Sequence, residues 1–339
     1  MLINKKRRRY NRNRSRIRIG NILLILLLAA VLGAAGFGVK KIIDSTRLQN
    51  KYDEARYASV YTLDEDSALL DLFALDLCVV RQNSSDPDYS AESGLVCSDG
   101  SMYADFSASS FVHMNPASTT KIMTALLALK YGNTDDLITV GEEAVIREEG
   151  ASLAKIMPGD RLTLYQLLYG LLLPSGNDAA NAIAVYVSGS VEKFIDLMNE
   201  EAAKLGCVDT HFRNAHGITE DNHYTSAYDL YLILNEAVKY DVFNDICCAK
   251  TYVCDYTNAS GEPVTRSWNN ANKYITEEVK APEGLKILAG KTGTTMAAGN
   301  CLALAVTDEN DKKHFSIVLK ASGKDELYRN MNHILEKIQ

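Results

Sequence analysis

A serine and a lysine three residues apart, Ser118 and Lys121, can do nucleophilic chemistry in this 339-residue chain. A serine hydroxyl is a weak nucleophile and needs a neighbouring base. Lysine can be that base only if burial or a nearby cation lowers its pKa well below the usual value of about 10.4. Pro116 predicts a helix start here, which places Ser118 among free backbone N–H groups and Lys121 one turn later on the same face. The alternative is a capping serine followed by an exposed lysine.

A second motif, Ser175-Gly176-Asn177, directly follows Pro174 and precedes a predicted helix at 178–187. A hydroxyl and an amide at a helix entrance can reach into a cleft. Serine and asparagine are also favoured as ordinary helix caps, so this motif alone does not identify a site.

A third motif, Lys291-Thr292-Gly293-Thr294, ends a predicted strand at 285–292. A lysine and a threonine at a strand end can bind a carboxylate, and the glycine lets a substrate backbone approach closely. If the strand lies at a sheet edge, a peptide could add to it as a further strand. We also expect Lys121 and Lys291 to lower each other's pKa if they converge on one cleft.

Strands at both ends of the chain bracket a helical middle. A helix after Ser118 is predicted from apolar residues at three- and four-residue spacing, Ile122, Ala125, Leu126 and Leu129. Strand, hairpin and helix patterns occupy the following ranges: strand 72–80, hairpin 94–111, helices 160–173, 178–187, 191–205 and 226–238, strands 251–256, 285–292, 301–306 and 314–319, and helix 327–338. This order predicts one sheet built from distant segments, with a helical lobe inserted between them.

The N-terminal region predicts a membrane anchor. A basic run at 5–18 precedes 18 residues without a polar side chain, 22–39, which as a helix are roughly 27 Å long against a hydrocarbon core of about 30 Å. We predict a basic cytoplasmic tail at 1–20, a transmembrane anchor at 21–39, a stalk at 40–67 and a folded domain at 68–339, which the positive flank places outside the cytoplasm. A cleaved signal peptide and a nucleic-acid-binding arm are the alternatives.

Charge and cysteine content exclude several other classes. The chain has a net charge of −7, but residues 1–41 carry eleven cations and no acid, so the remainder carries −18. This balance argues against nucleic-acid binding by the folded part. The seven cysteines contain no Cys-x-x-Cys motif, which leaves buried thiols or a bridge within the cluster at 247–254.

No metal or cofactor is expected. Three histidines, His211, His216 and His223, lack the His-Glu-x-x-His spacing of a zinc peptidase. The stretch from Gly284 to Gly290 has five residues between its glycines rather than the four of a phosphate-binding loop, and these residues are strand-like.

Taken together and in this order, the three motifs are the signature of penicillin-binding proteins and serine β-lactamases. The segments "PASTTKIMTALLAL", "PGDRLTLYQLLYGLLLPSGNDAANAIA", "FRNAHGI…HYTSAYDL" and "AGKTGTTMAAGNCLALAV" resemble the low-molecular-mass D-alanyl-D-alanine carboxypeptidases, serine peptidase family S11. The resemblance runs from about Leu72 to Gly323. It implies a β-lactamase/transpeptidase-like α/β (α+β) fold, with an antiparallel sheet flanked by helices and a helical lobe.

The resemblance also implies a role for each residue of the motifs. Ser118 would form an acyl-enzyme with a peptidoglycan stem peptide ending in D-Ala-D-Ala, and Lys121 would activate it. Ser175 would pass a proton to the leaving amine, and Lys291 would position Ser175. The substrate would be held by Asn177, Lys291, Thr292, Gly293 and Thr294, with the backbone N–H groups of Ser118 and Thr294 as the oxyanion hole. β-Lactam antibiotics would be covalent inhibitors.

The same fold is compatible with other functions. A D,D-transpeptidase or endopeptidase shares the motifs, and a non-catalytic cell-wall-binding protein would keep the fold without turnover. A class A β-lactamase requires a glutamate some 35–40 residues after the second motif, where this chain has Asp-Thr-His-Phe-Arg-Asn at 209–214. Many relatives carry a further β-domain and an amphipathic membrane helix, whose anchoring role we expect the N-terminal helix to take over. The segment 82–103 is longer and more polar than the tight hairpin expected there.

Overall fold

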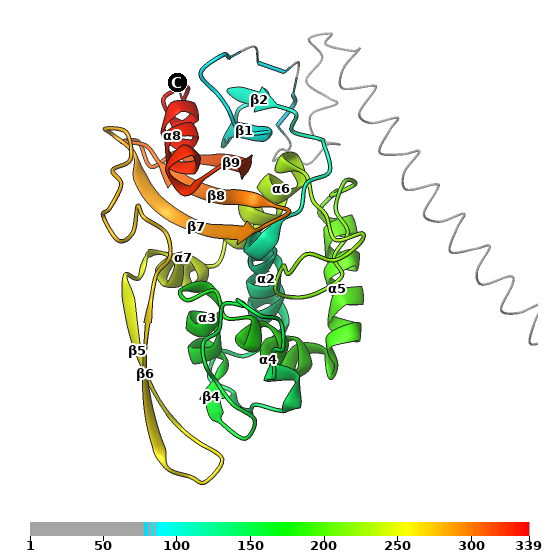
Figure 1. Ribbon diagram of the computed structural model, residues 1–339. Helices are drawn as coiled ribbons and strands as arrows, with labels where there is room; N and C mark the ends of the chain where they lie inside the picture. The colour runs from blue at the N-terminus through cyan, green and yellow to red at the C-terminus, as the bar shows by residue number, and fades with distance from the viewer. Residues whose placement is uncertain (1–77, 81–82, 85, 339) are drawn as a thin grey trace, which may run out of the picture. The chain divides into compact units, whose positions relative to one another are not determined.

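The computed structural model of the protein describes residues 78–80, 83–84 and 86–338 (Figure 1). The predicted tail, anchor and stalk lie outside these residues, and so does most of the strand predicted at 72–80. None of the helices in the described part combines the length and apolar character that a bilayer crossing requires.

The main sheet has five antiparallel strands in the order β2-β1-β9-β8-β7. Its strands are β1 (Ser93–Ser98), β2 (Phe106–Ala108), β7 (Lys286–Thr295), β8 (Gly299–Thr307) and β9 (Lys313–Ala321). The first strand pairs with the last along its whole length, from Ser93 opposite Leu319 to Ser98 opposite His314. Among the described strands this order leaves one side of β7 unpaired, so the strand that carries the third motif is an edge strand of this sheet.

Both faces of this sheet are covered, because its central strands are apolar on both sides. On β8, Leu302 and Leu304 belong to a core cluster with helix α8 (Lys324–Leu335), whereas Ala303 and Ala305 belong to the larger core shared with the helical region. Alternate residues of a strand point to opposite faces, so the two clusters are the two sides of one sheet. The small alanines let helix α6 contact the sheet closely.

Helices fill the middle of the chain, as its sequence predicts. They are α2 (Lys121–Tyr131), α3 (Leu164–Leu172), α4 (Asn177–Ser188), α5 (Val191–Lys204), α6 (Ala227–Ala237) and α7 (Asp241–Cys248). Ser190 and Ser226 cap α5 and α6 by accepting backbone N–H groups with their side chains. Gly189 ends α4 in the left-handed conformation, at φ 77°, which glycine adopts without strain.

A second sheet corrects the prediction of a single one. It has the order β3-β4-β5-β6 and consists of β3 (Leu137–Thr139), β4 (Arg161–Thr163), β5 (Thr251–Thr257) and β6 (Pro263–Asn269). The helix predicted at 160–173 therefore begins only at Leu164, because Thr163 and Gln166 form a capping box there. Tyr252 of β5 stacks on Tyr169 of α3 with ring centroids 3.7 Å apart, which joins this sheet to the helices. Figure 1 shows β5 and β6 as a long hairpin beside α3.

All seven cysteines are free, so the bridge considered for the cluster at 247–254 is not formed. Six are buried, and only Cys248 is exposed. Burial raises the pKa of the Cys247 and Cys254 thiols to about 12, which keeps them protonated and unreactive.

Candidate active site

The first and third motifs lie against each other although they are far apart in sequence. Ser118 lies in a 3₁₀ turn, η2 (Ala117–Thr120), that leads into α2, and the end of β7 contacts this turn. A Cβ atom at Gly293 would lie only 2.8 Å from the amide nitrogen of Ser118 and 3.0 Å from that of Thr119. Only glycine therefore allows the strand to approach the serine this closely. Ala117 is held at φ 47°, a left-handed conformation that costs roughly 1–2 kcal/mol for a residue with a side chain.

Lys121 is completely buried, with its amine beside the hydroxyl of Ser118. Its Nζ atom lies 3.1 Å from Ser118 Oγ, 2.7 Å from Asn177 Oδ1 and 2.6 Å from the carbonyl oxygen of His216. Burial, with a smaller contribution from the positive charge of Lys291, holds the pKa of Lys121 well below its usual value, and Asp178 opposes this shift weakly. A neutral amine can donate its two hydrogens to Asn177 and His216 and keep its lone pair for the proton of Ser118.

Lys291 is also buried, but it has a different environment. Its Nζ atom donates to the carbonyl oxygen of Thr292 at 2.9 Å. Burial lowers its pKa to about 8, so Lys291 is the amine that keeps its charge at neutral pH. The lowering that was expected to be mutual acts in one direction: the charge of Lys291 lowers the pKa of Lys121, whereas burial is what lowers the pKa of Lys291.

Ser175 holds a buried hydroxyl without a hydrogen-bond partner among the described residues. Its backbone is left-handed at φ 63°, just before α4 begins. Contrary to expectation, Lys291 does not donate to Ser175, since its amine is turned to Thr292. A buried polar atom that is unpaired costs free energy, and such atoms and strained backbones cluster at functional sites. The Ser175 hydroxyl is therefore free to bond a substrate group.

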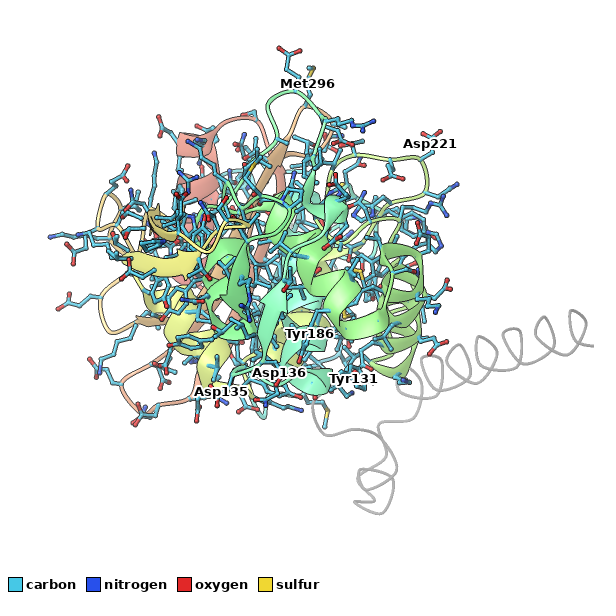
Figure 2. The ribbon with its side chains drawn as sticks, turned by 90° about the horizontal axis from the view of Figure 1, so that it is seen from below. Tyr131, Asp135, Asp136, Tyr186, Asp221 and Met296 are labelled. Carbon is cyan, nitrogen blue, oxygen red and sulfur yellow. The ribbon has the colours of Figure 1, made fainter. Side chains whose placement is uncertain are left out.

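The open end of the site lies at the tip of β7. Thr294 donates its hydroxyl hydrogen to Asn300 Oδ1 at 3.2 Å, which fixes the strand end. Thr295 and Thr219 share a hydrogen bond of 2.9 Å between their hydroxyl oxygens, which joins the β7–β8 hairpin to the loop after His216. Figure 2 shows Met296 and Asp221, one from each of these connections, projecting from the same side of the molecule.

Two features of the site were not predicted from the sequence. His216 takes part through its carbonyl oxygen rather than its ring, and Gly217 at φ 92° lets this chain segment pass directly against the carbonyl of Ala117. Asp178 accepts backbone N–H groups from Ala154 at 2.8 Å and Ile156 at 3.1 Å and so fixes the segment beside α4. An acid directly after Asn177, in the first turn of a helix, was the available signal for Asp178.

The histidine rings are not arranged as metal ligands. Burial first, and Lys121 second, lower the pKa of His216 to about 3, and burial lowers that of His223 to about 4, so both rings are neutral. Within the described ranges, no group of three or more histidine, cysteine or acidic residues could hold a metal ion.

Comparison with known proteins identifies the family of this site. Residues 82–323 match the D-alanyl-D-alanine carboxypeptidase family, peptidase S11. The D-alanyl-D-alanine carboxypeptidase DacF of Bacillus subtilis is 34% identical over 227 residues, which cover 65% of this chain and 55% of that protein. DacC of Escherichia coli is 33% identical over 266 residues, covering 75% and 62%. The chain thus spans little more than half the length of these relatives.

Solved structures give the same result for the fold. The Streptomyces K15 DD-transpeptidase has a TM-score of 0.69 and 29% identity, covering 75% of this chain and 98% of that one. Penicillin-binding protein 6B of Escherichia coli has a TM-score of 0.64 and 26% identity, covering 77% and 81%. The described part has the transpeptidase-like α/β fold that was predicted, and the chain belongs to the D-alanyl-D-alanine carboxypeptidase family, peptidase S11.

Proposed function

We propose that this protein is a serine-type D-Ala-D-Ala carboxypeptidase that removes the terminal D-alanine from peptidoglycan stem peptides. The observation that carries the proposal is the contact between Ser118 and Lys121. A lysine that is buried, hydrogen-bonded only to neutral oxygens and of lowered pKa can exist as the neutral amine that a general base must be.

In the acylation step, Ser118 Oγ attacks the carbonyl carbon between the two D-alanines while its proton passes to Lys121 Nζ. The backbone N–H groups of Ser118 and Thr294 support the negative charge that develops on the carbonyl oxygen. Removing one such donor in other enzymes costs roughly 10²–10³ in rate. The C–N bond then breaks, and the Ser175 hydroxyl passes the proton from Lys121 to the departing amine.

Lys291 and Thr292 bind the terminal carboxylate of the substrate. Lys291 is protonated at neutral pH because its pKa is about 8, and a bound carboxylate raises that pKa further. The unpaired edge of β7 can hydrogen-bond the peptide backbone, and Asn177 holds the peptide from the opposite wall. Hydrolysis of the acyl-enzyme by water, with Lys121 as base, returns the free Ser118 hydroxyl.

A second candidate function is D,D-transpeptidation, in which an amine rather than water takes the acyl group. The structural similarity to the DD-transpeptidase of Streptomyces K15 supports this second candidate. The first steps are identical, so the two functions differ only in the acceptor.

The proposal also places the catalytic domain on the extracytoplasmic side of the cell membrane, anchored by a single helix at 21–39. Its support is the apolar run and the cationic flank in the sequence. Protease treatment of intact cells whose wall has been removed checks this: the domain should be cleaved while a tag at the N-terminus stays protected.

Mass spectrometry of a stem pentapeptide after incubation with the protein tests the activity. We expect the loss of one alanine, and an added acceptor amine reveals transpeptidation by a product of higher mass. Ser118→Ala should abolish both turnover and covalent labelling by a fluorescent penicillin. An unchanged pentapeptide, or labelling that persists in Ser118→Ala, contradicts the proposal.

A further inference from the structure

A groove of about 450 Å³ lies beside the candidate active site and has no part in the chemistry above. Its walls are the segment Leu153–Lys155, Pro174 and the β6 residues Thr265–Asn269. Pro174 directly precedes Ser175, so this wall of the groove adjoins a residue of the candidate active site.

The wall of this groove is fixed before any ligand arrives. Ser152 accepts the backbone N–H of Asn177 at 2.9 Å, and Ala154 accepts the indole N–H of Trp268 at 2.9 Å. The carboxylate of Asp178 holds the N–H of Ala154. Lys155 stands in the middle of this wall at φ 63°, with an exposed side chain between two buried neighbours. A preformed wall spares a ligand the cost of ordering it.

The charge of the groove differs from that of the chain around it. The chain beyond residue 41 carries −18, yet the lining contains no acidic residue and two cations, Lys155 and Arg266. The Lys155 side chain forms no ion pair with any described residue. Arg266 hydrogen-bonds the Tyr256 hydroxyl, and its buried Nε atom lacks a partner within the described part. Lys155 is therefore the cation that an anionic ligand meets first.

The strand along the groove fits a peptide. β6 is the edge strand of the second sheet, so one side of its backbone is not paired within that sheet. Free backbone groups at a sheet edge can bond an extended peptide. In the proposed reaction only one residue lies beyond the scissile bond, and Lys291 holds its carboxylate on β7. Any longer part of the substrate therefore lies on the amino-terminal side and must leave the cleft by another route.

We infer that this groove is a subsite for a carboxylate carried by the stem peptide on the amino-terminal side of the scissile bond, with Lys155 as its partner. The inference rests on the proposed function and adds a substrate preference to it. Lys155 would bind the substrate carboxylate through a charge-assisted hydrogen bond. Because Lys155 is exposed, water partly screens this interaction.

Three donor peptides test this subsite on the full-length protein. The first is a short donor, diacetyl-L-Lys-D-Ala-D-Ala, whose only charge is its terminal carboxylate. The other two are extended at the amino end by a γ-linked D-glutamate, with its α-carboxylate either free or amidated. For the unchanged protein we expect kcat/KM for the free acid to exceed that for the amide by roughly 3- to 10-fold, and less at high salt.

Two variants of Lys155 and one control identify the residue responsible. Lys155→Gln should bring the ratio of acid to amide to about 1, and Lys155→Glu should reverse it, while the short donor is turned over as before. Lys193→Glu makes the same change in net charge as Lys155→Glu, but on α5, which lies on the far side of the helices from β6, and it should leave the ratio unchanged (Figure 1).

The outcomes separate the two proposals. A ratio that survives Lys155→Gln, or that changes equally in Lys193→Glu, overturns the subsite. Failure of the unchanged protein to turn over the short donor or to be labelled by penicillin would instead overturn the proposed function.

Discussion

The helical wall and the sheet wall of the candidate active site each present a buried lysine, and the two lysines are prepared for opposite tasks. On the helical side, Lys121 has three neutral oxygens around its amine, and its pKa lies well below the usual value. On the sheet side, Lys291 has one carbonyl partner and a pKa of about 8. The comparison teaches that the residue type alone does not decide the role, since burial beside a second cation yields a base on one wall and a charged anchor on the other.

Replacing the helical lysine is expected to have the largest effect. Lys121→Met removes the base and should lower the rate of acylation by a penicillin about 10³-fold, within the range of general-base contributions. It also leaves Asn177 Oδ1 and the His216 carbonyl without their donor, so we expect a loss of stability of about 2 kcal/mol.

Stopped-flow labelling measures this rate, after circular dichroism has established the temperature at which the variant is folded. Lys193→Met, on the exposed face of α5, serves as the control and should react as the unchanged protein does. An acylation rate for Lys121→Met within tenfold of that of the unchanged protein would show that Lys121 is not the general base.

The contact between the two walls gives the next largest effect. Gly293→Ala introduces a Cβ atom 2.8 Å from the amide nitrogen of Ser118, and the strand must move away from the turn. Because this movement separates the two N–H groups of the oxyanion hole, acylation should fall roughly 10²-fold. The same substitution at Gly323, where a Cβ atom would meet nothing within 4 Å, should change little. Equal rates for both variants would mean that the close approach has no catalytic consequence.

The sheet lysine is expected to control the alkaline side of the pH profile. The rate rises with pH as Lys121 loses its proton, whereas Lys291 loses its charge as the pH rises through about 8 and then binds a carboxylate less well. We therefore expect kcat/KM for a D-Ala-D-Ala peptide to decline several-fold above about pH 8. In kcat the decline should occur at higher pH, because the bound carboxylate raises the pKa of Lys291.

Arginine at this position sharpens the test, since it stays protonated throughout the accessible range. In Lys291→Arg the decline of kcat/KM above about pH 8 should disappear, and the acidic side should be unchanged. If kcat/KM of Lys291→Arg still declines above about pH 8, the decline is caused by the titration of another group.

The middle of the chain could be predicted closely from its sequence. The helices predicted at 178–187, 191–205 and 226–238 are α4, α5 and α6, each within one residue at either end. Their apolar spacing gives a distinct signal, and α5 and α6 are also preceded by capping serines. The four later strands predicted by their apolar runs are present as β5, β7, β8 and β9.

Other parts carried no such signal. α7 is short, and its N-cap residue Tyr240 makes no side-chain cap, so nothing in its sequence marks its start at Asp241. β6 begins with Pro263, which weighs against a strand but is tolerated at a sheet edge. The carbonyl oxygen of His216 at Lys121 could not be foreseen, since every residue has a carbonyl group and only the fold decides which one is used.

The pairing of β1 with β9 has a consequence for how the protein acquires this structure. Ser93 lies opposite Leu319, so β1, which pairs with β2 on its other side, gains its second neighbour only after β9 has been synthesised. β7, which carries Lys291 and Gly293, joins the same sheet only through β8 and β9. Contacts between such distant segments form slowly. The sheet wall therefore assembles only after β9 has been synthesised, and truncation within β9 should leave a chain that contains every residue of the three motifs but cannot acylate.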